Sequence, residues 1–97
     1  QYINDLRERA YGDNSGNISS GELTLPFILD ERARELYWEC HRRTDLIRYG
    51  LFTGGDYLCP WKGNTADGRA TDAKYNLFPL AASDVSANPL LSQNPNY

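Results

Sequence analysis

Residues 26–49 carry the clearest helical period in this chain. Their apolar or small side chains recur in steps of three and four, at Leu29, Ala33, Leu36, Cys40, Thr44 and Ile47. This spacing places them on one stripe of an α-helix. Thr24 is suited to cap the start of such a helix, and Gly50 can take the left-handed conformation that ends one. The sequence therefore predicts one long amphipathic helix over this segment.

A ladder of charged residues runs along the same segment. Glu39, Arg42, Asp45 and Arg48 alternate in sign at steps of three, so that each side chain can reach the next on a helix. On an exposed face such pairs are worth only about 0.3–0.5 kcal/mol each, whereas a covered ladder makes every partner costly to remove. Periodicity does not choose between these two interpretations. We predict that Arg42 and Asp45 are covered and structural, and that the ladder does not bind ligand.

Composition limits the class of protein. The chain has 97 residues, 40% of them hydrophobic and 24% charged, which suits one small globular domain. The net charge is −3 and no basic patch contains interleaved aromatic residues, so nucleic acid is not an expected partner. No apolar run approaches the length of a membrane span. Because the chain starts at Gln1 and contains no methionine, we expect it to be a fragment of a longer protein.

No metal site is predicted. The two cysteines, Cys40 and Cys59, form neither a CxxC pair nor a Cys–His ligand spacing. Residues 13–24 resemble a calcium loop but have Ile18 where its turn needs glycine and Thr24 where it needs glutamate. Cys40 is expected to be a small core residue. The sequence leaves open whether the two cysteines form a disulfide in an oxidising compartment.

The rest of the chain divides at residue 50. Residues 1–11 read as the last turns of a helix that Gly12 ends, and residues 13–21 as a polar surface loop. Residues 52–73 are glycine-rich and predict a long, irregular loop. Two Asn-Pro steps predict an extended tail, whose apolar residues are expected to dock on the helices: Leu77, Phe78, Leu80, Val85, Leu90 and Leu91. Residues 1–50 are thus predicted to be helical, and residues 51–97 a loop and docking tail.

The sequence contains no catalytic constellation, so we expect neither an enzyme nor a cofactor. Its one histidine, His41, follows Cys40, and neighbours on a helix point about 100° apart, which rules out a Cys–His dyad. Tyr57, Trp61 and Tyr75 could stack on the apolar face of a sugar ring. Alternatively, these aromatic residues pin the long loop to the core.

Several separated motifs resemble the SusD/RagB family. The first lies in residues 30–50 and comprises Glu31-Arg32, Glu35-Leu36, Glu39, Arg42, Asp45-Leu46 and Arg48. The others follow in the family's order: PWKG at 60–63, NLFPL at 76–80, SDV at 83–85, ANPL at 87–90 and QNPNY at 93–97. This chain differs at Cys40 and Asn96, where the family more usually has glycine, and at Cys59, where it often has an aromatic residue.

The resemblance implies a fold and a function. Members are mainly α-helical, with tetratricopeptide-like helical repeats and irregular binding loops. They are outer-membrane lipoproteins of Bacteroidetes-type bacteria that form a lid on a TonB-dependent transporter and capture glycans or other nutrients without catalysis. Residues 1–97 would form the C-terminal segment of such a protein.

We therefore expect a module that binds a glycan or other nutrient. The proposed contacts are Trp61 first and Tyr57 second, with polar side chains such as Asp56, Asn64 and Asp67 beside them. The alternative is a structural or protein-interaction helical domain whose long loop contacts a partner chain.

Overall fold

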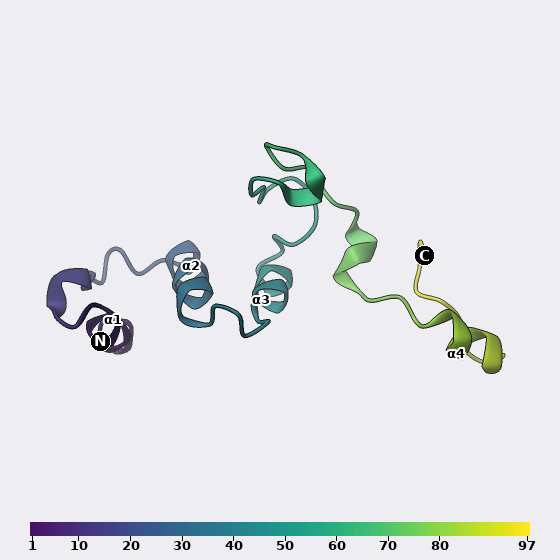
Figure 1. The fold of residues 1–97 in the computed structure, drawn as a ribbon, viewed down its shortest axis with the longest axis horizontal. Coiled ribbons are helices and arrows are strands. Elements are labelled where there is room, and N and C mark those ends of the chain that lie inside the picture. Colours follow the sequence, from purple (N-terminus) through teal and green to yellow (C-terminus); the bar gives the residue numbers. More distant parts are fainter. The chain divides into compact units, whose positions relative to one another are not determined.

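The computed structural model describes all of residues 1–97 (Figure 1). Its helical elements, in chain order, are α1 (Tyr2–Tyr11), η1 (Asn14–Gly16), α2 (Leu25–Glu35), α3 (Arg42–Arg48), η2 (Lys62–Asn64), η3 (Ala73–Asn76) and α4 (Ala82–Ala87). There is no strand, only an isolated bridge between Gly54 and Thr71. This confirms the mainly α class. The chain forms two compact units, an N-terminal unit (Gln1–Cys40) and a C-terminal unit (His41–Tyr97).

The single long helix predicted over residues 26–49 is wrong. Thr24 caps α2 as expected, since its hydroxyl accepts the Phe27 N–H at 3.3 Å, but α2 ends at Glu35. A turn follows, in which Trp38 and Cys40 have φ of 68° and 61°, and α3 begins only at Arg42 (Figure 1). Positive φ cannot continue a right-handed helix. The segment between the two helices consists mainly of residues with lower helix propensity: Tyr37, Trp38, Cys40 and His41.

The N-terminal unit is built from α1, η1 and α2. Gly12 ends α1 as predicted, with φ of 82° and its N–H bonded to the Glu8 carbonyl at 2.8 Å. The side-chain amide of Asn4 makes two hydrogen bonds of 3.0 Å to the backbone of Ile18, which ties the polar loop to α1. Leu29 on α2 is 2% exposed and is the only buried apolar residue of the chain.

A mostly covered charged side chain, that of Arg7, makes the central contacts of the N-terminal unit. Its Nη1 lies 2.8 Å from Glu31 Oε2, and its Nε donates to the Gly16 carbonyl. Its guanidinium lies 5.3 Å from the ring centre of Tyr11 and 5.6 Å from that of Phe27. A side chain on Gly16 would put its Cβ 2.7 Å from the Tyr11 ring, so only glycine fits there. Arg7 therefore joins α1, η1 and α2.

Helix α3 carries three of the four ladder residues, and the fourth lies outside it. Asp45 is 2% exposed, and its Oδ1 lies 3.5 Å from Arg48 Nη1. Arg42 donates a 2.6 Å hydrogen bond to the Tyr57 hydroxyl. Glu39 lies in the turn before α3, so helical spacing does not connect it to Arg42. That the ladder is structural stays a prediction.

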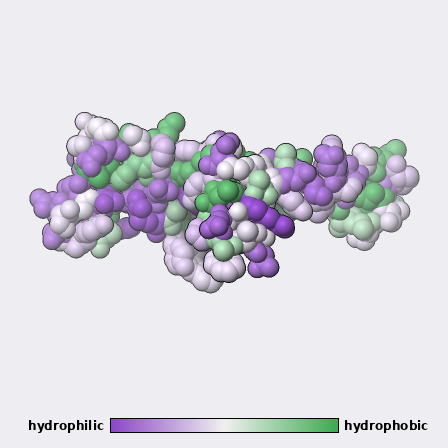
Figure 2. Space-filling model, turned by 90° about the horizontal axis from the view of Figure 1, so that it is seen from above, coloured by the Kyte–Doolittle hydropathy of each residue, from purple (hydrophilic) through white to green (hydrophobic).

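Hydrogen bonds hold the C-terminal tail at several points. The Gln93 side-chain amide bonds both the N–H and the carbonyl of Leu80, at 2.8 and 2.9 Å. The Tyr97 hydroxyl donates to the Leu77 carbonyl at 2.9 Å. Five of the tail's apolar residues are exposed within this chain, Leu90 by 93%: Leu77, Phe78, Leu80, Leu90 and Leu91. That they dock on helices stays a prediction. Figure 2 shows hydrophobic residues at the surface of the end that carries α4.

The cysteine predictions also change. Cys40 is exposed and is not a core residue, because the turn after α2 removes it from the apolar stripe. Cys59 is exposed as well, and both are free thiols. Among the helices, none has the length and apolar character that crossing a membrane requires.

Candidate functional site

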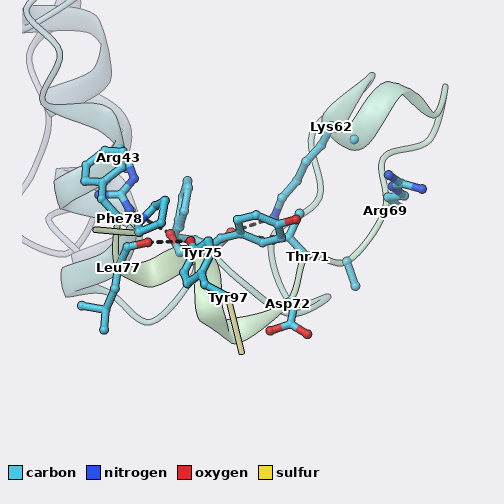
Figure 3. Close-up of a pocket in the computed structure, with 13 residues that line it drawn as sticks. Arg43, Lys62, Arg69, Thr71, Asp72, Tyr75, Leu77, Phe78 and Tyr97 are labelled. Carbon is cyan, nitrogen blue, oxygen red and sulfur yellow. Dashed lines mark hydrogen bonds between the residues drawn. The ribbon is translucent and has the colours of Figure 1, made fainter. Parts of the chain in front are cut away.

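A pocket of about 860 Å³ lies within the C-terminal unit, between the long loop and the tail (Figure 3). Four aromatic rings line it, from Phe52, Tyr75, Phe78 and Tyr97. Its charged lining consists of Arg43, Lys62, Arg69 and Asp72, and the remaining lining residues are Gly63, Ala70, Thr71, Leu77 and Pro79. The pocket thus combines flat apolar surfaces with an excess of positive charge.

Arg43 is a fixed part of the pocket wall. It projects from α3, and its Nη2 donates to the backbone carbonyls of Tyr75 and Asn76 at 2.8 and 3.2 Å. Its guanidinium lies 4.0 Å from the ring centre of Phe78 and 5.0 Å from that of Phe52. Arg43 therefore connects the helix, the loop and the tail, and its carbonyl partners leave its charge uncompensated.

The side chain of Lys62 links two other parts of the long loop by hydrogen bonds. Its Nζ donates to the carbonyls of Phe52 and Tyr57 at 3.1 and 3.0 Å. The Lys62 carbonyl accepts the Arg69 N–H at 3.0 Å, which closes the inner turn of the loop over residues 62–69. The Gly54 N–H adds a 2.9 Å bond to the Thr71 carbonyl. Hydrogen bonds from Lys62 thus help to fix the conformation of the glycine-rich loop. Helical or strand periodicity in the sequence does not predict this role.

The side chain of Arg69 makes no ion pair or hydrogen bond, and it is exposed at the rim of the pocket (Figure 3). Its stem lies against Gly63, where an added Cβ would come within 2.6 Å of Arg69 Cγ. Asp72, also at the rim, accepts the Lys74 N–H with Oδ1 at 2.8 Å. The rim therefore offers one guanidinium without a protein partner and one carboxylate.

Two tyrosines form the aromatic end of the pocket. Tyr75 and Tyr97 meet edge to face, with ring centres 6.3 Å apart. The Tyr97 hydroxyl is tied to the carbonyls of Lys74 and Leu77, and Lys74 Nζ lies 5.2 Å from the Tyr97 ring centre. The hydrogen bonds of its hydroxyl fix the position of Tyr97. The exposed ring of Tyr75, which packs against Tyr97, faces the pocket (Figure 3).

The two residues predicted to contact a ligand do not line this pocket. The Tyr57 hydroxyl accepts a hydrogen bond from Arg42, whose guanidinium also lies 5.5 Å from the ring centre, so Tyr57 packs against α3. Trp61 is 68% exposed and has φ of 67°, with its N–H bonded to the Ala66 carbonyl at 3.3 Å. No hydrogen bond or ring contact joins Tyr57 to Trp61. Sequence reasoning flagged Tyr75 but missed Arg69, which no motif contains. It also gave no role to Tyr97, although the QNPNY motif ends on that residue.

Two carboxyls of the N-terminal unit have a lowered pKa. Hydrogen bonds from Ser15 lower the pKa of Asp13, and hydrogen bonds from Ser19 lower the pKa of Glu22. Both carboxyls are exposed and in the N-terminal unit, and a lowered pKa favours the carboxylate and not a general acid. No group of three or more His, Cys, Asp or Glu side chains is placed to hold a metal ion.

Comparison with known proteins identifies the family. The sequence model of the SusD family matches residues 1–97, so this mainly helical chain belongs to that family, as its motifs indicated. It is 40% identical over 95 residues to the starch-binding protein SusD of Bacteroides thetaiotaomicron, which covers 98% of this chain and 16% of that protein. It is 48% identical over 97 residues to the SusD-like protein P25 of Formosa agariphila, covering 97% of this chain and 18% of that protein. The chain spans less than a fifth of either relative.

Proposed function

We propose that the full-length protein binds a glycan or a related nutrient at the outer membrane and does not transform it. The observation that carries this proposal is the family match over residues 1–97, together with a 40% identical relative named a starch-binding protein. Residues 1–97 would be the C-terminal segment of that protein, attached to a scaffold of tetratricopeptide-like helical repeats. The absence of a catalytic cluster in the sequence is consistent with capture and not turnover.

The location and the partner follow from the family resemblance. The protein would be a cell-surface lipoprotein that forms a lid on a TonB-dependent transporter, which takes up the captured ligand. A structural or protein-interaction domain is the second candidate, and a specific observation favours it. Leu90 is 93% exposed and its neighbour Leu91 is 40% exposed, as expected of residues that another polypeptide covers.

Calorimetric titration of the full-length protein tests the main proposal. Maltoheptaose is the first probe, because one relative is named for starch binding, and a panel of other oligosaccharides follows. Binding of at least one saccharide, and recovery of a transporter from solubilised outer membranes, are expected. Failure of every saccharide, with a protein partner still recovered, would favour the interaction domain. Release of reducing ends from a bound saccharide would show that the protein is an enzyme.

Trp61 is the proposed aromatic contact in the long loop, and Tyr57 is the weaker candidate because Arg42 engages it. The exposure of Trp61 leaves its ring free to stack on a sugar. Trp61→Ala is expected to weaken binding of the identified glycan by about tenfold, since aromatic stacking is worth about 0.5–1.5 kcal/mol beyond burial. Trp38→Ala, which removes another exposed tryptophan, is the control. Unchanged affinity with a lower melting temperature would make Trp61 a structural residue.

A further inference from the structure

We infer that the pocket of the C-terminal unit is a subsite for an acidic sugar residue, one that carries a carboxylate or a sulfate group. The inference rests on the proposed function and names its ligand class. Tyr75 would support the ring of the sugar, and Arg69 would bind its acidic group (Figure 3).

The charge of the pocket wall is the first argument. The chain as a whole has a net charge of −3, yet three cations and one carboxylate line this pocket. Arg43 and Lys62 are bonded to backbone carbonyls, which fix their positions without neutralising them. Aromatic walls of low polarity focus such a field, and a concave surface of one sign concentrates ligands of the opposite sign. An anion is therefore favoured here although the chain is acidic.

The second argument is the state of Arg69. Its guanidinium has no protein partner, while its backbone N–H is bonded to Lys62 and its stem lies on the bare backbone of Gly63. A guanidinium offers paired N–H donors that match the oxygens of a carboxylate or a sulfate. Since the backbone is already fixed, little ordering is needed when this pair forms. An arginine that supported only the fold would be expected to use its donors within the protein, as Arg43 does.

The third argument is the ring of Tyr75, a residue that is 47% exposed and whose ring centre lies 5.3 Å from Lys74 Nζ. Its neighbour Tyr97 is held by two backbone carbonyls, so Tyr75 is supported at its edge and exposed over the pocket. A sugar ring presents a face of C–H groups that packs on an aromatic ring. The Asp72 carboxylate keeps acceptor capacity for sugar hydroxyls beyond its one bond to Lys74. The volume of about 860 Å³ lies within the range of about 300–1,000 Å³ typical of small-ligand pockets.

The experiment titrates the full-length protein with three probes: trigalacturonate, a sulfated galactose oligosaccharide, and neutral maltoheptaose. Arg69→Gln removes the charge at the rim, and Arg9→Gln removes an exposed charge from the N-terminal unit as the matched control. Tyr75→Leu and Tyr37→Leu form a second pair that tests the aromatic platform. Arg69→Gln is expected to weaken binding of an acidic probe at least tenfold, because a hydrogen bond to a charged group is worth about 1.5–3 kcal/mol. Binding of a neutral saccharide should not change.

The outcomes separate the two proposals. Which acidic probe binds distinguishes a carboxylate from a sulfate, and inorganic sulfate shows whether an anion suffices without the sugar ring. If neutral saccharides bind and both acidic probes fail, the inference is overturned and the proposed function stands. If no saccharide binds, the proposed function fails as well. Equal affinities of Arg69→Gln and Arg9→Gln for the acidic probe would also overturn the inference. Should a variant unfold, wild-type affinity for the acidic probe must still fall steeply with salt.

Discussion

Removing the charge of Glu31 should open the N-terminal unit. Glu31 Oε2 accepts from Arg7 Nη1 at 2.8 Å and from Arg34 Nη2 and Nε at 2.7 and 3.0 Å. The side chains of Arg7 and Glu31 are only 13% and 11% exposed, whereas that of Arg34 is 57% exposed. Because the two ion pairs differ in exposure, the contribution of each to stability can be considered separately.

The magnitude follows from that difference. An exposed pair such as Glu31 with Arg34 contributes about 0–1 kcal/mol. Breaking a buried pair by removing one partner costs about 3–5 kcal/mol, because the remaining charge is left uncompensated. Arg7 keeps the Gly16 carbonyl and two aromatic rings, so the lower end of that range applies. Glu31→Gln is expected to lower the free energy of opening this unit by about 3 kcal/mol.

Hydrogen exchange of the full-length protein measures this local effect. A loss of about 3 kcal/mol corresponds to roughly 100-fold faster exchange for amides in residues 12–18 and 25–35. Glu35→Gln is the matched control, because it breaks the pair with Arg9, whose side chains are 31% and 65% exposed. That control should accelerate exchange less than about tenfold.

The double variant Arg7→Met with Glu31→Leu completes the test. Replacing both charges with apolar side chains leaves no unpaired ion, so much of the lost protection should return. If Glu31→Gln and Glu35→Gln accelerate exchange equally, burial does not decide the strength of these pairs. The assignment of Arg7 as the residue that joins the three elements would then be wrong.

Two further predictions concern backbone conformation and pH. Cys40→Gly should raise stability by up to about 1 kcal/mol, because a non-glycine residue at positive φ costs about 1–2 kcal/mol and glycine loses about 0.5–1 kcal/mol in entropy. Asn96→Gly should raise it less, since asparagine tolerates this conformation. An unchanged or lower melting temperature for Cys40→Gly would contradict the reasoning. The pKa of Glu22 is lowered from 4.5 by hydrogen bonds from Ser19, so its contribution to stability is present above pH 4.5 and is lost as the pH falls through the lower pKa of the folded state. Exchange of the loop amides should therefore accelerate below that pH in the wild type but not in Glu22→Gln, and identical profiles would count against it.

The parts of the fold that the sequence predicted are those fixed by neighbours in the chain. Gly12 ends α1 and Thr24 caps the start of α2, and each does so through a hydrogen bond to a residue three or four positions away. Such contacts depend on local residue type, which the sequence states directly. The polar loop between the two helices follows for the same reason.

The pocket depends on contacts between residues far apart in the chain, so the sequence could not predict it. Arg43 reaches Tyr75, Tyr97 reaches Leu77, and Lys62 reaches Phe52. Each of these bonds ends on a backbone carbonyl, which every residue type presents alike. No spacing rule therefore connects the partners. Tyr75 was singled out as an aromatic residue that could stack on a sugar, but its residue type did not place it in this pocket. Nor could the sequence show that Tyr57 packs against Arg42.

The break between α2 and α3 is different, because the sequence did contain a sign of it. The family resemblance marked Cys40 and Asn96 as positions where glycine is more usual, and the structure gives them φ of 61° and 71°. Glycine is the residue that adopts positive φ without a steric penalty, so its usual presence indicates a left-handed backbone position. A left-handed residue at position 40 is incompatible with one helix through residues 26–49. The apolar period continued across the break because α2 and α3 each follow it separately. Periodicity predicts which way the side chains point on a helix. It does not test whether one continuous helix joins the two segments.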